Sequence, residues 1–442
     1  MTLLSFCCSR PMWLLRSHRT LAAFRPVTAG TGIGVLSCAR RLLGLLLLAV
    51  LAFGSVAQAE EPLRAEVGKH LQAAQDLMQK GRAKEALAQI SEADAVSGKN
   101  AYESFTIERM RASVAAASGD NALAARSFEA VVAANKLPPA DQLKTIEALG
   151  GTYYRLQNYQ KSAIWVARYL KEGGTDPAMR ALLAQDFYLA GDYAGAAREL
   201  QTEFANGESG GKAPGEDRLQ MLLACQRRLK DGAGYVNTME KLVTLYPKKE
   251  YWSDLVQRVE TRNGFSDRLQ IDLYRFKLAH GFITQPTQIM ELAQLALQAG
   301  YPSLGKKAMD QGFSSGLLGK GATADREQRL RALVEDTLKS SQRDLPKTLK
   351  EAHENRDGIA LINLGAQLVD AGDSKQGTAL AEEGFQKGNF NHPDDARLRL
   401  GELYIAAHQD AKANNLLKAV GGKDGAADVA HLWLLQNRVG EH

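Results

Sequence analysis

Cysteine is almost absent from the chain after residue 59. Three of the four cysteines, Cys7, Cys8 and Cys38, precede that point, and Cys225 alone follows it. No intramolecular disulfide can therefore form in residues 60–442, and Cys225 is either a reactive thiol or a small apolar residue on the buried face of a helix. Only 12 prolines interrupt 442 residues, and runs of β-branched residues are few, so the composition favours helices over sheet.

Acidic residues and lysine are absent from residues 1–59, which contain six arginines. The net charge of +5 therefore belongs to this segment, because the remaining chain has 49 basic and 50 acidic residues. Short basic clusters such as Lys248-Lys249 are typical of solvated helix faces. The sequence gives no support to nucleic-acid binding.

One long apolar run, residues 42–57, follows Arg40-Arg41 and leads into Ala57-Gln58-Ala59. A basic flank, an apolar core and small residues at positions −3 and −1 are the parts of a secretory signal peptide. We therefore predict a signal peptide over residues 1–59, cleavage after Ala59 and a periplasmic protein. An uncleaved anchor in the inner membrane is the alternative, although the run is shorter than the ~20 residues that span hydrocarbon comfortably. A start at Val35 would shorten the signal peptide to a compact length.

Motifs that carry catalysis, cofactors or metal ions are missing after residue 59. No two histidines there lie three or four residues apart on a helix, as a metal-binding pair requires. The glycine-rich segment from Gly207 to Ala213 has the wrong spacing for a phosphate-binding loop and follows a helix rather than a strand. We expect no enzyme activity, no cofactor and no metal site. An enzyme of a class without short motifs is the remote alternative.

One pattern recurs along residues 60–442: two amphipathic stretches, each with small residues at fixed places, separated by a turn. Leu149-Gly150 and Leu183-Ala184 begin equivalent segments that lie 34 residues apart. Two helices of about 14 residues with short turns fill this interval, and neither helix can bury its apolar stripe alone. The pattern predicts an all-α fold, an α-solenoid of about ten helical hairpins, each in contact with its neighbours.

Turn residues and small residues indicate where in the sequence each hairpin turns and where its two helices cross. Small residues should lie where the two helices of a hairpin cross, as at Ala74 and Ala86, or at Gly365 and Gly377. A further hairpin between residues 300 and 372 would use the segments from Arg326 to Ser340 and from Leu345 to Asn355. The turns are predicted at Gly81, Gly119, Gln157, Gly191, Asp231, Asn263, Gly300, Gly372 and His408.

The segments Leu149–Tyr169 and Leu183–Glu203 resemble the tetratricopeptide repeat family. The resemblance extends over most of residues 62–435, with Trp252 at the family's aromatic start and Pro247 at its closing proline. It implies a non-catalytic scaffold that binds other proteins in a groove lined by the first helix of each hairpin. The groove-facing positions carried over from the family are Arg109, Lys144, Glu147, Tyr154, Gln185, Tyr188 and Gln257. Tyr154 and Tyr188 are either interface anchors, able to stack side by side, or half-buried packing residues.

The glycine-rich segment 204–218 has a composition that should interrupt helix formation. We therefore expect it to divide the array into N-terminal repeats over 60–203 and C-terminal repeats over 219–442. The segment is either a hinge or an inserted surface loop.

The segments 246–260 and 277–318 contain a Tyr-Pro…Tyr-Trp start, at Tyr246 to Trp252, and a Leu-Ala-Gln-Leu helix from Leu292. They are similar to the periplasmic tetratricopeptide proteins that accompany TonB–ExbB–ExbD energy-transduction systems. This resemblance implies envelope protein partners, TonB-system components among them. A scaffold for exopolysaccharide or outer-membrane assembly is the alternative. Contact with the membrane is expected only through an uncleaved signal segment.

Overall fold

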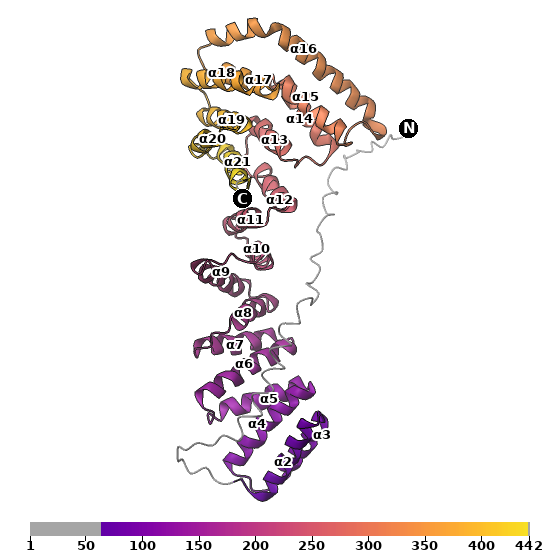
Figure 1. The fold of residues 1–442 in the computed structure, drawn as a ribbon, viewed down its shortest axis with the longest axis vertical. Coiled ribbons are helices and arrows are strands. Elements are labelled where there is room, and N and C mark those ends of the chain that lie inside the picture. The colour runs from indigo at the N-terminus through magenta and orange to yellow at the C-terminus, as the bar shows by residue number, and fades with distance from the viewer. Residues whose placement is uncertain (1–62, 441–442) are drawn as a thin grey trace, which may run out of the picture. The chain divides into compact units, whose positions relative to one another are not determined.

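The computed structural model describes residues 63–440, and these residues form helices, turns and loops without any strand (Figure 1). The fold class is confirmed: the chain is all-α, and consecutive helices pack in hairpins. The predicted signal peptide and the cleavage site after Ala59 lie outside the described residues. No helix within residues 63–440 is both long and apolar enough to cross a membrane.

The chain divides into two compact units, residues 1–179 and 180–442. The described part of the first unit contains three hairpins, whose cores are built from Val67, Leu71, Ile90 and Ile107 and, further on, from Phe128 and Leu149. Its helices are α2 (Ala65–Gln79), α3 (Ala83–Ala95), α4 (Ala101–Ser118), α5 (Asn121–Ala133), α6 (Pro139–Arg155) and α7 (Tyr159–Lys171), and the boundary falls within α8 (Pro177–Leu189).

The second unit has one continuous core that runs through all of its hairpins. Its helices are α9 (Tyr193–Ser209), α10 (Glu216–Leu229), α11 (Gly232–Leu245), α12 (Lys249–Glu260), α13 (Gln270–Ala279), α14 (Pro286–Gln298), α15 (Pro302–Ser314), α16 (Ala324–Glu354), α17 (Ile359–Asp370), α18 (Ser374–Lys387), α19 (Pro393–Ala406), α20 (Asp410–Leu417) and α21 (Ala426–Gly440), with short 3₁₀ turns η1 (Asp267–Leu269) and η2 (Gly321–Thr323).

Five of the hairpin turns in residues 63–440 share a two-residue device, whereas the turns at Gly81-Arg82, Gly300-Tyr301 and His408-Gln409 have the positive φ but no side-chain cap. A residue with positive φ ends the first helix, and the next residue, an Asp or Asn, caps the second helix by accepting a hydrogen bond from the backbone N–H at its third position. In the hairpin of α8 and α9, Gly191 has φ +84° and Asp192 Oδ1 accepts from Gly195 N at 2.8 Å. The same arrangement recurs at Gly119-Asp120, Gln157-Asn158, Lys230-Asp231 and Gly372-Asp373.

Small residues do lie at the helix crossings. Ala74 and Ala86 are completely buried between α2 and α3. Gly365 of α17 and Gly377 of α18 face each other so closely that a Cβ added to either would lie 2.5 Å from the backbone oxygen of the other. The prediction that small side chains permit close approach is confirmed here.

Two local predictions were wrong. Residues 204–209 are the last turns of α9, so the glycine-rich connection is shorter than predicted, and the core continues across it because Phe204 and Leu219 are both buried there. Residues 324–354 are one helix, α16, and not a hairpin. Pro346 does not end α16, and the surrounding segment offers no positive-φ residue at which the chain could turn back.

The C-terminal helices of the second unit pack against helices that precede them in the sequence by more than a hundred residues. α21 packs against α11, α12 and α13 as well as against α19 and α20 (Figure 1). Arg399 of α19 pairs with the buried Asp272 of α13 at 3.1 Å, and Trp433 of α21 lies edge-on to Phe276 of α13 at 5.1 Å between ring centroids. The second unit is therefore not a simple series in which each hairpin contacts only its neighbours.

Candidate partner-binding surfaces

The first helices of two adjacent hairpins in the first unit, α4 and α6, border a small hollow. Arg109 of α4 and Asp141 of α6 form an ion pair across it, with 3.6 Å between Arg109 Nη2 and Asp141 Oδ2. Lys144 lies one turn beyond Asp141, at the exposed rim. Phe128, Val131, Leu137 and Ala148 provide the apolar part of the lining. The hollow thus combines two cations, one carboxylate and an apolar surface.

Glu147 follows Lys144 by one turn on α6 and is half-buried. Burial raises the pKa of this carboxyl, and the nearby negative charge of Asp176 raises it further, whereas Lys144 lowers it. Because desolvation is the largest cause, Glu147 is a carboxyl whose charge is only partly solvated. The poorly solvated carboxylate of Glu147 and the nearby negative charge of Asp176 would favour a cationic group of a ligand beside them.

The two predicted anchor tyrosines occupy equivalent places in their hairpins. Tyr154 near the end of α6 lies edge-on to Tyr159 at the start of α7, with 5.6 Å between ring centroids. Tyr188 near the end of α8 lies edge-on to Tyr193 at the start of α9, at 5.7 Å. Both anchors are half-buried, so each packs within its own hairpin while keeping part of its ring accessible. Side-by-side stacking of Tyr154 on Tyr188 stays a prediction.

The structure therefore brings Arg109 and Lys144 into one hollow, with Glu147 and Tyr154 on the same first helix as Lys144. Gln185 and Tyr188 lie half-buried on α8, and Gln257 is exposed on α12 of the second unit. That these residues contact a partner stays a prediction. The pairing of Arg109 with Asp141 was not predicted, because Asp141 lies outside the family positions carried over.

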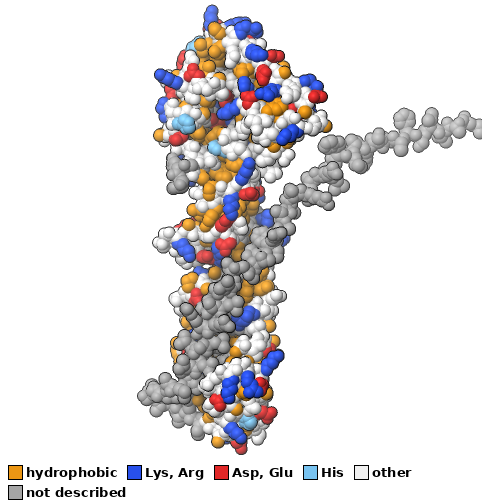
Figure 2. Space-filling view, turned by 45° about the vertical axis from the view of Figure 1, so that its right-hand side comes forward, with side chains coloured by type: hydrophobic (Ala, Val, Ile, Leu, Met, Phe, Trp, Pro, Cys, Tyr) orange, Lys and Arg blue, Asp and Glu red, His pale blue; other side chains and the backbone are white. Residues whose placement is uncertain are grey.

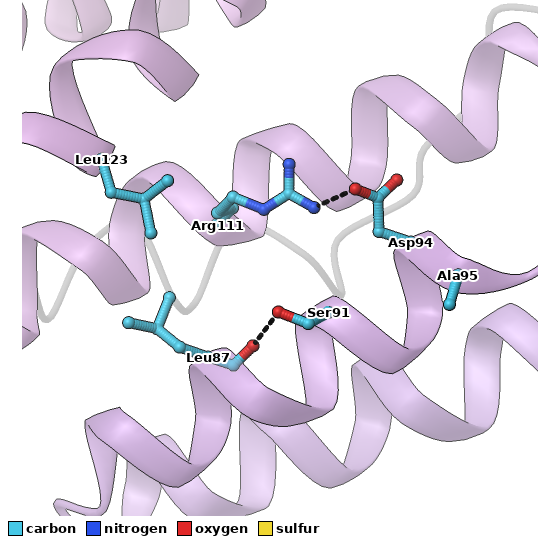
Figure 3. Close-up of a pocket in the computed structure, with 6 residues that line it drawn as sticks. All are labelled: Leu87, Ser91, Asp94, Ala95, Arg111 and Leu123. Carbon is cyan, nitrogen blue, oxygen red and sulfur yellow. Dashed lines mark hydrogen bonds and ion pairs between the residues drawn. The ribbon is translucent and has the colours of Figure 1, made fainter.

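A second hollow was missed by the sequence analysis. It has a volume of about 450 Å³ and opens between the second helices α3 and α5, with Arg111 of α4 at its side (Figure 3). Arg111 Nη2 lies 2.6 Å from Asp94 Oδ2, and Ser91 Oγ donates to the backbone oxygen of Leu87 at 3.0 Å. Leu87 and Leu123 face each other across the opening (Figure 3). The spacing of Leu87 and Ser91 on one helix face was the available signal.

Cys225 is completely buried on α10, and burial raises the pKa of its thiol to about 11. A thiol with this pKa is protonated at neutral pH and therefore weakly nucleophilic. The interpretation of Cys225 as a small apolar core residue is confirmed.

The face of the molecule drawn in Figure 2 is mixed in charge. On the face drawn in Figure 2, acidic and basic side chains are interspersed among apolar ones. Within residues 63–440, no three His, Cys, Asp or Glu side chains come together as a metal site would require.

No protein-family model matches the sequence, and no curated protein is significantly similar to it. Among solved structures, the chain is similar to yeast Tom70, with 10% identity over 85% of this chain and 89% of that one and a TM-score of 0.24. It is similar to the TPR2AB domain of yeast Sti1, solved with an HSP90 peptide, with 13% identity over 85% and 98% and a TM-score of 0.22. It is also similar to the P58(IPK) TPR domain, with 14% identity over 85% and 99% and a TM-score of 0.22. Scores this low do not establish a common arrangement of helices, so the fold assignment depends on the hairpins of the chain itself.

Proposed function

We propose that this protein is a non-catalytic scaffold that binds other proteins, and that a partner segment docks on α4 and α6 of the first unit. The hollow shared by Arg109, Asp141 and Lys144 carries the proposal. Its two cations come from successive first helices, and the half-exposed pair between Arg109 and Asp141 can open toward a ligand at low cost, because exposed ion pairs contribute only ~0–1 kcal/mol.

The apolar residues of the hollow add hydrophobic contacts to the ion pairs that a partner could form there. Phe128 and Val131 are buried beneath the hollow, whose volume of about 20 Å³ holds no more than a water molecule, so an apolar side chain of the partner would lie over its rim. Tyr154 on the same helix as Lys144 adds an aromatic surface of the kind that dominates interface energetics. The partner segment is therefore expected to combine an apolar side chain with polar groups that pair with Arg109, Asp141 and Lys144.

The cellular setting is part of the proposal. Export to the periplasm follows from the signal peptide predicted over residues 1–59, and the TonB–ExbB–ExbD setting follows from the resemblance of the segment around Trp252. The partners proposed on this basis are envelope proteins, with components of a TonB system first among them.

Site-specific crosslinking in intact cells tests the docking surface. A photoreactive residue is placed at Lys144, and the control is the same residue at Lys84, an exposed lysine of α3 in the same unit. We expect position 144 to capture a defined envelope protein that position 84 does not, and Arg109→Glu to abolish that capture. Identical capture at both positions, or capture that Arg109→Glu leaves unchanged, would reject the surface.

A separate measurement tests the setting. The purified chain is titrated with the periplasmic domains of TonB and ExbD, and Lys144→Glu should weaken any binding that uses this hollow. Binding to other envelope proteins with none to TonB or ExbD would reject the TonB setting and leave the scaffold function standing.

A further inference from the structure

The end of α10 exposes a short run of basic and apolar side chains: Arg227, Arg228, Leu229 and Lys230. Basic residues in the last turn of a helix counter its negative end, which accounts for part of this composition. The helix dipole does not account for the exposure of Leu229, a large apolar residue that is 44% exposed. Among residues 63–440, none of these three cations forms an ion pair with a carboxylate.

A cation–π contact connects the last turn of α10 with the start of α9. The guanidinium of Arg228 lies over the ring of Tyr193, 5.8 Å from its centroid. Tyr193 is in turn edge-on to Tyr188, and the next residue, Leu189, is 42% exposed. We call Leu189, Tyr193, Arg227, Arg228, Leu229 and Lys230 the basic edge of the second unit.

The two aspartates of these turns are already engaged. Asp192 Oδ1 accepts a hydrogen bond from Gly195 N at 2.8 Å, and Asp231 Oδ1 accepts one from Gly234 N at 2.9 Å. Each therefore caps a helix N-terminus, where the helix dipole offsets much of its charge. The basic edge consequently presents positive charge that forms no ion pair with a carboxylate of residues 63–440, together with exposed apolar surface.

We propose that the basic edge binds an acidic amphipathic segment of a partner protein. Apolar side chains of that segment contact Leu189 and Leu229, and its carboxylates pair with Arg227, Arg228 and Lys230. This surface differs from the hollow of the proposed function, so it is a second docking site. The two leucines offer too little apolar area for insertion into a bilayer, which takes a large continuous apolar face.

A synthetic peptide provides the probe: a helix-forming sequence with leucines at positions i and i+4 flanked by glutamates. Its affinity for the full mature chain is measured by fluorescence anisotropy, at low and at raised salt. The variant Arg227→Gln/Arg228→Gln should weaken binding about tenfold, which corresponds to about 1.4 kcal/mol, because two charge pairs at an interface rim are lost. Raised salt should weaken wild-type binding as well.

Matched variants make the result specific. Arg326→Gln/Arg329→Gln removes two exposed arginines of α16 in the same unit and should leave binding unchanged. Leu229→Ser keeps the charge and should still weaken binding, which separates docking from general charge attraction. The melting temperature of each variant shows that it is folded.

Three outcomes would overturn the proposal. They are an absence of peptide binding to the wild-type chain, an equal loss of affinity in the α10 and α16 variants, and binding to anionic phospholipid vesicles in place of the peptide. The last outcome would assign the basic edge to a membrane surface. None of them bears on the hollow at Arg109 and Lys144, so failure here and failure of the proposed function remain distinguishable.

Discussion

Replacing Gly365 by alanine should destabilise the second unit, although alanine is the better helix former. A Cβ at this position would lie 2.5 Å from the backbone oxygen of Gly377 and 2.9 Å from the Cβ of Ala381. An unstrained C···O contact needs about 3.3 Å or more, so α17 and α18 must separate by about 0.8 Å. The separation loosens the contacts of both helices.

Two opposing effects decide how much Gly365→Ala changes the free energy of unfolding. Gly→Ala within a helix gains about 1 kcal/mol of helix propensity. Overpacking a close contact typically costs about 1–3 kcal/mol, and here the obstacle is backbone, which cannot rotate away. We expect a net loss of ~1–2 kcal/mol in the free energy of unfolding, which lowers the melting temperature by about 2–8 °C for a unit of this size.

Thermal unfolding followed by circular dichroism or calorimetry measures this change. The control is Gly232→Ala at the start of α11, where an added Cβ meets nothing within 4 Å. The control should melt at or slightly above the wild-type temperature. A Gly365→Ala protein as stable as the wild type would refute the reasoning, because it would show that α17 and α18 can separate without cost.

Three further predictions rest on the structure, and a fourth rests on the sequence. Asp272→Ala leaves Arg399 unpaired in the interior and should cost about 3 kcal/mol or more in denaturant unfolding, of which Asp272→Leu/Arg399→Met should recover most. Cys225 should react with a thiol reagent only after denaturation, and rapid labelling of the folded chain would contradict its burial. The Arg64 guanidinium lowers the pKa of Glu103 to about 2. The stability that this pair contributes is therefore present above the unfolded pKa of ~4.3 and is lost as the pH falls through about 2. Glu103→Gln should make the free energy of unfolding depend less on pH between ~4.3 and about 2. N-terminal sequencing of the exported protein should begin at Glu60, and a species that retains residues 42–56 would indicate an anchor instead.

The sequence by itself determined the local features of this protein. Seven of the nine predicted turn residues have positive φ, from Gly81 to His408, and the other two turns, at Lys230 and Gly264, are one residue away from the prediction. The small residues at the helix crossings were found in the same way. Both features depend on neighbours within a few residues, because backbone conformation and helical period are local properties.

Only the tertiary structure decided how far the helices continue and which distant helices meet. α9 extends through Gly207, and α16 passes Pro346 without turning back. The hollow at Arg109 also depends on Asp141, a residue that no family position indicated.

The packing of the C-terminal helices α19 and α21 against helices of the α11–α13 segment is the clearest case. It depends on contacts such as Arg399 with Asp272, which are 127 residues apart. No local pattern encodes such a pair, because the attraction between the two charges arises only when folding brings them together, and it must offset the cost of removing both from water.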